Sequence, residues 1–362
     1  MLTKNQFALL SYIAVRPADE PALSQRAIAQ GTGKALGTVN GLVKQLDAMG
    51  YLDGANRITD AGRAALAPYR VDNAVIMAAG MSSRFAPLSY EKPKALLKVK
   101  GEVLIEREIR QLQAAGIDDI TIVVGYMKEK LFYLEDRFHV KIVINEDYHR
   151  YNNPSTLMLV RDRLKNTFIC SSDNYFEQNP FEPYVYQAYY AALYSVGKTD
   201  EYCVVTNRKG RITGVQVGGS DAWYMIGHVY FDRSFSEKFT QILEREYDSP
   251  VTRAGLWEDL YARHIRELEM YIRKYPGGIH EFDSLDELRA FDSAYVTNTD
   301  SYIFDNICAV LHCAPDSIHG IIPIKTGLTN LSFKFSCGGR DYVYRHPGAG
   351  TEAYIDRPAE AR

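Results

Sequence analysis

The sequence of 362 residues lacks the features that mark membrane and secreted proteins. No apolar run is long enough to span a bilayer, and no cleavage site follows the short amphipathic stretch at the N-terminus. We therefore expect a cytoplasmic protein. An excess of charge is also lacking. The net charge of −3 excludes a chain that binds polyanions over its whole surface, but not one with a local basic patch.

Cysteine is scarce as well. The five cysteines are odd in number and none is spaced as C-x-x-C: Cys170, Cys203, Cys308, Cys313 and Cys337. Cys308 and Cys313 resemble half of a metal site, but the sequence has no second pair. We therefore expect buried, reduced thiols rather than a disulfide framework or a zinc site.

The length indicates two or three domains, and three regions differ in their apolar pattern. Residues 1–70 show helical periodicity only. Residues 71–295 alternate apolar strands with amphipathic helices. Residues 296–362 end in alternating strands separated by glycine-bearing turns, from about Ile318 onward.

The first region resembles the winged-helix family of bacterial regulators. Its order is helix, turn, helix, then a hairpin with Arg57 and a further helix. The helix that would read DNA offers Thr38, Asn40 and Lys44, with Lys34 just before it. The basic excess is small and no second symmetric half is visible, so the region is predicted either to bind DNA or to serve as a docking or dimerisation module.

From Val71 the pattern predicts β-α-β units, with "NAVIMAAG", "DITIVVGY" and "VKIVINED" as strands. Such units form a mostly parallel, doubly wound α/β sheet with helices on both faces. Ligands of these sheets bind beyond the carboxyl ends of the strands. The loop after the first strand is therefore predicted to lie at the active edge.

That loop, "MAAGMSSRF", is followed by "EKPKALLKV" and contains neither G-x-G-x-x-G nor G-x-x-x-x-G-K-[ST]. Its chemistry nevertheless suits phosphate. Small residues let the backbone approach a ligand, successive N–H groups can form an anion nest, and arginine can bind two phosphate oxygens. Lys94 adds a point charge after the rigid Lys92-Pro93 segment. The predicted nucleotide-binding residues are Ala78, Ala79, Gly80, Met81, Ser82, Ser83 and Arg84.

This spacing resembles the signature of the nucleotidyltransferase family that makes nucleotide sugars and CDP-alcohols. In that family the loop wraps the triphosphate of an NTP, and the lysine of the K-P-K segment contacts the phosphate at the reacting centre. The resemblance makes Lys94 and Arg84 catalytic residues. It implies nucleotidyl transfer as the activity.

The motifs "YNNPSTL", "SSDNYF", "GLWEDL" and "HEFDS" resemble the phosphocholine cytidylyltransferase branch of the family, over residues 72–293. The resemblance places Asn152, Asn153 and Ser155 near the base and ribose. It makes Asp173 a catalytic residue and the first Mg²⁺ ligand. A turn-forming role for Asp173 is the structural alternative.

The same resemblance gives Glu258 the second metal position, where an aspartate is usual, with Asp259 as the neighbouring alternative. Four residues are predicted to bind the amino-alcohol head group: Tyr202, Trp257, Glu281 and Asp283. Leu256 stands where the branch has another aromatic residue. Glu281 or Asp283 could instead cap the helix that follows.

The expected reaction needs no general base, because a phosphomonoester is already anionic at neutral pH. One of its oxygens attacks the α-phosphorus of CTP, and pyrophosphate leaves. Mg²⁺ held by two carboxylates, together with Lys94 and Arg84, is expected to neutralise the charge that builds up.

The last region resembles the start of choline kinase-like phosphotransferases. Thr329 and Asn330 match a G-x-T-N loop, and Arg345 stands where a strand of that family supplies a cation. The catalytic residues of that family come later in its sequence. We therefore expect an incomplete kinase domain from a longer bifunctional chain.

The predicted function is cytidylyl transfer from CTP to phosphocholine. One alternative is the same reaction on 2-aminoethylphosphonate or phosphoethanolamine. Another is a DNA-binding regulator that uses the central domain to sense a nucleotide. A sugar-nucleotide pyrophosphorylase fits "YNNPSTL" and "HEFDS" less well.

Overall fold

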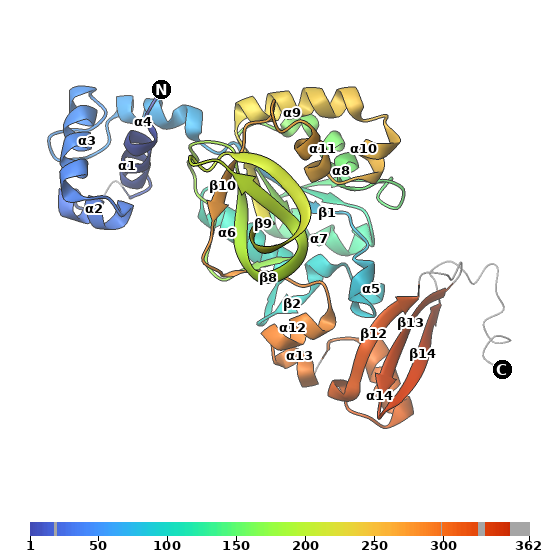
Figure 1. Cartoon of the computed structure of the whole chain (residues 1–362). Coiled ribbons are helices and arrows are strands. Elements are labelled where there is room, and N and C mark those ends of the chain that lie inside the picture. Colours follow the sequence, from blue (N-terminus) through green and yellow to red (C-terminus); the bar gives the residue numbers. More distant parts are fainter. Residues whose placement is uncertain (18–19, 298, 325–329, 348–362) are drawn as a thin grey trace.

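The computed structural model describes residues 1–17, 20–297, 299–324 and 330–347. Figure 1 shows a small helical N-terminal domain, a central domain built on a large sheet, and a C-terminal unit of helices with a small sheet. Among the described residues, no helix has both the length and the apolar character that a membrane span requires.

The described residues of the N-terminal domain form four α-helices in the expected order. Polar side chains explain where three of them begin, because Thr3, Ser24 and Thr59 each accept a hydrogen bond from a backbone N–H of the following first turn. An antiparallel bridge joins Leu52 to Ile58 before the last helix. The helices are α1 (Lys4–Ala14), α2 (Gln25–Thr32), α3 (Leu36–Ala48) and α4 (Asp60–Leu66).

The central domain contains a seven-stranded sheet in the order β10-β8-β9-β6-β1-β4-β5. The neighbours β6, β1, β4 and β5 are parallel, as are β10 and β8, whereas β9 is antiparallel to both of its neighbours. The predicted mostly parallel sheet is therefore confirmed. Its strands are β1 (Asn73–Ala78), β4 (Ile120–Val124), β5 (Lys141–Ile144), β6 (Thr167–Ser171), β8 (Tyr189–Thr206), β9 (Ile212–Phe231) and β10 (Tyr271–Lys274).

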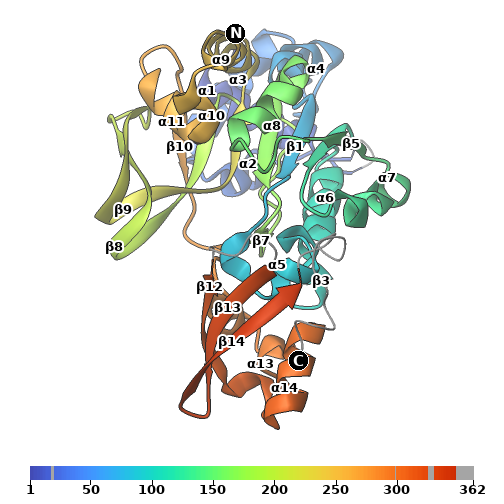
Figure 2. The same cartoon turned by 90° about the vertical axis from the view of Figure 1, so that its right-hand side faces the viewer.

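Helices cover both faces of this sheet, as the alternation along β1 requires. Ile76 lies in the core that includes Ile105 of α6, and its neighbour Val75 lies in the core that includes Leu260 of α11. Figure 2 shows the long β8–β9 hairpin projecting from the domain, a feature that the periodicity did not predict. The helices are α6 (Leu104–Ala114), α7 (Tyr133–Phe138), α8 (Asn153–Leu159), α9 (Arg233–Glu246), α10 (Pro250–Ala254) and α11 (Trp257–Arg263).

Short elements surround the carboxyl edge of the sheet. Strand β7 (Asn174–Phe176) pairs with β11 (Ile279–Glu281) in antiparallel register, and β2 (Lys98–Val99) pairs with β3 (Glu102–Val103). Helix α5 (Leu88–Glu91) lies between the loop after β1 and Lys94. These elements connect the sheet to the part of the chain that follows residue 284.

The C-terminal unit, residues 294–297, 299–324 and 330–347, follows α12 (Leu285–Phe291). Its three strands form an antiparallel sheet in the order β12-β13-β14, as the alternating pattern predicts. In both views this unit lies beside α5. Its elements are α13 (Ala294–Thr297), α14 (Tyr302–Leu311), β12 (Ile318–Ile324), β13 (Asn330–Cys337) and β14 (Arg340–Pro347).

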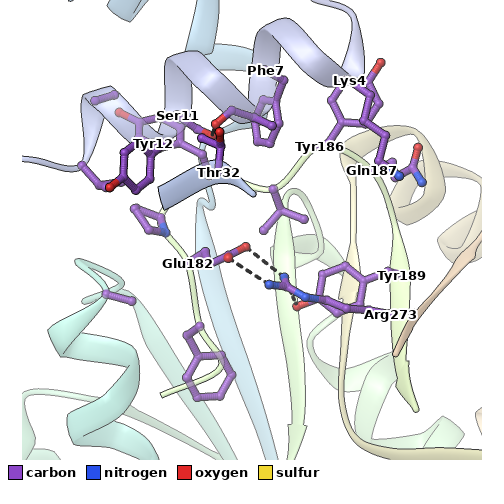
Figure 3. A pocket seen from close by; sticks show the side chains of 18 of the residues that line it. Lys4, Phe7, Ser11, Tyr12, Thr32, Glu182, Tyr186, Gln187, Tyr189 and Arg273 are labelled. Atoms are coloured by element: carbon purple, nitrogen blue, oxygen red, sulfur yellow. Dashed lines mark hydrogen bonds and ion pairs between the residues drawn. The ribbon is translucent and has the colours of Figure 1, made fainter. Parts of the chain in front are cut away.

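The N-terminal domain contacts the central domain through aromatic rings. Tyr186, just before β8, stacks on Tyr69 at 5.6 Å between centroids, and its hydroxyl donates to the backbone oxygen of Leu2. A cleft of about 930 Å³ opens next to these contacts. Figure 3 shows Phe7 of α1 on one side of this cleft and the Glu182–Arg273 ion pair on the other.

Candidate active site

A cavity of about 210 Å³ lies at the carboxyl edge of the sheet, where the loop after β1 was predicted to act. Ala78, Ala79, Gly80 and Ser82 line it from that loop, and Lys94 and Asp173 line it from two other segments. Strands β1 and β6 are neighbours and parallel, so both of their carboxyl ends open into this cavity. The topology thus brings together residues almost a hundred positions apart.

The loop itself is shaped for close approach of a ligand. A Cβ added at Gly80 would meet no atom within 4 Å, so the space in front of this residue is open. Ser82 has a left-handed backbone with φ of 47°, which turns the chain into the short 3-10 helix Ser83–Phe85. Met81 is exposed and does not line the cavity. Of Ser83 only the backbone is described.

Lys94 and Asp173 meet in the cavity. Nζ of Lys94 donates to Oδ2 of Asp173 at 2.9 Å, and only 6% of the lysine side chain is exposed. Burial lowers the pKa of Lys94, but the charges of Asp173, Glu281 and Asp283 outweigh burial and raise the pKa overall. The ammonium group is therefore held charged at the position where phosphate would bind.

Two further carboxylates belong to this cluster. Glu281 of β11 is paired with Asn174 of β7, which places it beside Asp173. The negative charge of Asp173, followed by desolvation, raises the pKa of Glu281. Asp283 forms a two-pronged ion pair with Arg84, with distances of 3.1 and 3.2 Å. Neither carboxylate caps α12, because Ser284 does so.

The donors in this cluster suit a divalent cation. Oδ1 of Asp173 is buried and has no hydrogen-bond partner among the described residues. Within the same residues, no three acidic, histidine or cysteine side chains converge closely enough to hold a metal ion by themselves. This arrangement fits Mg²⁺, which keeps several waters and binds through one or two carboxylates together with substrate phosphates.

Glu258 was predicted as the second metal ligand, but its described contacts lie elsewhere. Its carboxylate accepts a hydrogen bond from Tyr190 Oη at 3.0 Å and faces Nδ2 of Asn153 at 3.5 Å. The ring of Tyr190 stacks on Trp257 at 5.7 Å and 5°. Burial raises the pKa of Glu258 to about 7. A buried carboxylate beside aromatic rings is a favourable environment for an organic cation.

The residues next to Glu258 have separate tasks. Asp259 accepts from the backbone N–H of Leu256 and from the hydroxyl of Tyr202, so it holds the start of α11 against β8. Trp257 is only 1% exposed. Trp257 therefore packs behind the ring of Tyr190, an aromatic side chain that the sequence analysis did not select.

Asn153 joins the two halves of the site. Its Oδ1 accepts from the backbone N–H of Trp257 at 2.7 Å, while Asn152 begins α8 and also lines the cavity. Ser155 is buried, and its hydroxyl donates to the backbone oxygen of Asn152 and accepts from Asn145. Ser155 therefore orders the loop from beneath rather than lining the cavity.

The cavity also has a wall that sequence reasoning did not identify. It consists of residues that follow β5 or lie in α8: Asn145, Tyr148, Tyr151 and Thr156. Their position after a parallel strand was the available signal, because β5 ends at Ile144 on the same edge as β1.

The other predicted residues lie outside this site. On the N-terminal domain Thr38, Asn40 and Lys44 are exposed on α3, whereas Lys34 donates to Oδ1 of Asn5 at 2.8 Å. Arg57 lies between the bridged residues of the hairpin. In the C-terminal unit, Arg345 is exposed on β14, Thr329 lies outside the described residues, and only the backbone of Asn330 is described.

Known proteins share this architecture. Residues 74–253 match the model of the MobA-like NTP transferase domain. The choline-phosphate cytidylyltransferase of Streptococcus pneumoniae is 31% identical over 220 residues, which cover 60% of this chain and 96% of that protein. The 2-aminoethylphosphonate cytidylyltransferase of Lancefieldella rimae is 34% identical over 229 residues, covering 62% of this chain and 93% of that protein.

Structural similarity gives the same result. The solved structure of the CTP:phosphocholine cytidylyltransferase from Streptococcus pneumoniae superimposes with a TM-score of 0.60 and 31% identity, covering 62% of this chain and 99% of that one. Both curated relatives are thus matched over nearly their full length by the central part of the chain. The chain belongs to the nucleotidyltransferase family of MobA-like NTP transferases that includes these bacterial cytidylyltransferases.

Proposed function

We propose that this protein transfers a cytidylyl group from CTP to phosphocholine or a closely related amino-phospho compound, releasing pyrophosphate. The observation that carries the proposal is the meeting of Lys94 and Asp173 in a cavity formed by the loop after β1. The similarity to cytidylyltransferases that act on choline phosphate and 2-aminoethylphosphonate supports CTP as the nucleotide.

In this proposal the chain acts mainly by positioning and by charge. The backbone from Ala78 to Ser82 wraps the triphosphate, and Asn152 and Asn153 border the nucleoside. Lys94 stays charged and releases Asp173 to contact the phosphate at the reacting centre. Arg84 is exposed on the loop and exchanges Asp283 for phosphate oxygens when the nucleotide binds. The substrate oxygen is already anionic, so its in-line attack needs no base.

We assign the Mg²⁺ ligands to Asp173 with Glu281 or Asp283, in place of the predicted Glu258. The pairing of β7 with β11 supports this assignment, because it sets Glu281 opposite Asn174, the residue that follows Asp173. Bound there, Mg²⁺ would supply positive charge against the negative charge that builds up on the phosphate oxygens.

We assign the head group to the side chains of Glu258, Tyr190 and Tyr202, in place of the predicted Glu281 and Asp283. A quaternary ammonium cannot donate hydrogen bonds, so it is best bound by aromatic faces and a negative charge. Glu258 offers the negative charge and Tyr190 the aromatic ring, and a hydrogen bond joins the two side chains. The charge of Glu258 would attract a primary ammonium group as well, so phosphoethanolamine and 2-aminoethylphosphonate remain the alternative substrates.

The test is a direct assay of pyrophosphate release. The purified protein is given CTP and Mg²⁺ with phosphocholine, phosphoethanolamine or 2-aminoethylphosphonate, and kcat/KM is compared. We expect the highest value with phosphocholine. A preference of about tenfold or more for a primary amine would overturn that substrate, and no release with any of the three would overturn the function itself.

The two flanking parts carry separate proposals. The exposed side chains Thr38, Asn40 and Lys44 on α3 support DNA as a partner of a winged-helix domain. The order of β12, β13 and β14 supports a choline kinase-like start. Use of CTP supports a cytoplasmic location. Retardation of DNA by residues 1–362 but not by a Lys44→Glu variant would support the first of these proposals.

A further inference from the structure

The C-terminal unit shares one hydrophobic core with the segment that leads from the phosphate loop to Lys94. Phe85 and Leu88 of that segment lie in the same buried cluster as Phe304 of α14 and Phe333 of β13. Tyr90 extends this contact, because its hydroxyl donates to the backbone oxygen of Ser332 at 3.2 Å. The segment is therefore packed between the active site and the C-terminal unit.

Two charged residues at the end of α5 also bind the start of α14. The carboxylate of Glu91 accepts from the backbone N–H of Ile303 at 2.8 Å and from the hydroxyl of Ser301 at 3.0 Å. Nζ of Lys92 donates to the carboxylate and to the backbone oxygen of Asp300, at 2.7 and 2.9 Å. We call Glu91, Lys92, Asp300 and Ser301 the latch.

The geometry of the latch is suited to fixing a backbone position. Ser301 is the N-cap of α14, so the Glu91 carboxylate lies at the positive end of a helix and accepts one of its unpaired N–H groups. The Lys92 side chain is only 18% exposed. Glu91 at the end of α5 and Lys92 just after it carry opposite charges and bind adjacent points at and just before the N-cap of α14, which resists both sliding and rotation.

Lys94 follows the latch by two residues. Pro93 between them is buried and restricts the backbone of Lys92, and the side chain of Lys94 reaches Asp173 at 2.9 Å. A displacement of Glu91 would therefore also displace the ammonium group of Lys94. The latch partners Asp300 and Ser301, just before α14, lie beyond residue 253, where the match to the family model ends.

We propose that the latch is a positioning device for the transfer reaction, through which the C-terminal unit holds Lys94 in its reactive place. This inference rests on the proposed function. It makes the C-terminal unit part of the transferase, although its strands resemble the start of another domain. The four latch residues act through Lys94 and do not contact substrate.

The experiment compares Glu91→Ala and Ser301→Ala with the conservative Ser301→Thr in the full chain. We expect kcat for pyrophosphate release to fall about tenfold in both alanine variants, with KM for CTP changed less than about threefold and the threonine variant close to wild type. Lys334→Ala is the control, since it removes an exposed ion pair to Asp341 in the same unit. Its kcat should be unchanged.

If an alanine variant does not fold, exchanging the charges of Lys92 and Asp300 tests the same proposal. Lys92→Glu and Asp300→Lys should each lower kcat, and the double variant should recover it by about threefold or more over either single variant. The proposal is overturned if the variants lose thermal stability but keep kcat, or if Lys334→Ala loses kcat equally. An inactive wild type would refute the proposed function instead, so the two failures are distinguishable.

Discussion

Replacement of Glu258 by glutamine separates its two assignments, head-group binding and metal binding. Glutamine keeps an acceptor for the Tyr190 hydroxyl and removes the charge. As a head-group residue, Glu258 should affect KM for phosphocholine and leave the dependence on Mg²⁺ unchanged. As a metal ligand, Glu258 should affect the dependence on Mg²⁺ and leave KM for phosphocholine unchanged.

The magnitude follows from the burial of the carboxylate. Burial raises the pKa of Glu258 from 4.5 to about 7. At pH 7 the carboxyl group is therefore about half ionised, and completing its ionisation costs only about 0.4 kcal/mol, which is RT ln 2. A quaternary nitrogen at roughly 5 Å, in an effective dielectric of about 20, returns about 3 kcal/mol. We therefore expect Glu258→Gln to lose about 2–3 kcal/mol, or 30- to 150-fold in kcat/KM for phosphocholine.

The assay measures pyrophosphate release while phosphocholine and Mg²⁺ are varied in turn. Glu244→Gln is the control, because its ion pair with Arg161 involves none of the residues assigned to the head group. A loss below about threefold in kcat/KM would refute the head-group assignment. If excess Mg²⁺ restores the activity of Glu258→Gln, the head-group assignment is refuted and Glu258 is a metal ligand.

Three further predictions follow from the same geometry. Asp173→Asn should lower kcat by about 100-fold or more with the melting temperature unchanged within a few degrees, and near-normal turnover at saturating Mg²⁺ would make Asp173 structural. Lys94→Ala should lower kcat more than it raises KM for CTP, and a change in KM alone would limit Lys94 to ground-state binding. The raised pKa of Glu258 means that wild type is stabilised below pH 4.5 and loses this stability as pH rises through about 7. The free energy of unfolding, measured for wild type and Glu258→Gln, should therefore show the variant gaining stability relative to wild type between pH 5 and 8. A difference that stays constant over this range would contradict the raised pKa.

The sequence was sufficient to predict those parts of the site that depend on local pattern. The strand before Gly80, the loop and the placement of Lys94 and Asp173 at one edge all follow from parallel strands that end together. The contacts of Glu258 and Asp259 could not be predicted, because adjacent positions on a helix point in different directions and only the docking of α11 fixes what each one meets. Likewise Glu281 reaches Asp173 through the antiparallel pairing of β11 with β7, whose register depends on distant contacts.

The long-range core of the C-terminal unit was missed for a related reason. The alternating pattern predicts its strands but says nothing about which surface they cover. Phe333 faces Tyr90 across 6.1 Å, and neither residue carries a local signal for the other. The boundary predicted at residue 295 thus follows the change in sequence pattern, whereas the buried cluster that includes Phe85 and Phe333 crosses it.

The aromatic contact of the N-terminal domain has a consequence for communication along the chain. Tyr186 touches that domain, and Tyr190, which holds Glu258, follows four residues later. Four residues span at most about 14 Å. Binding of the proposed head group at Glu258 and the placement of α1 would thus act on the two ends of one short stretch. If that stretch moves when substrate binds, the two effects are reciprocal. A partner that binds the N-terminal domain would then change the affinity for substrate by the same factor by which substrate changes the affinity for that partner. Hydrogen exchange of the α1 amides, measured with and without phosphocholine, would report this linkage.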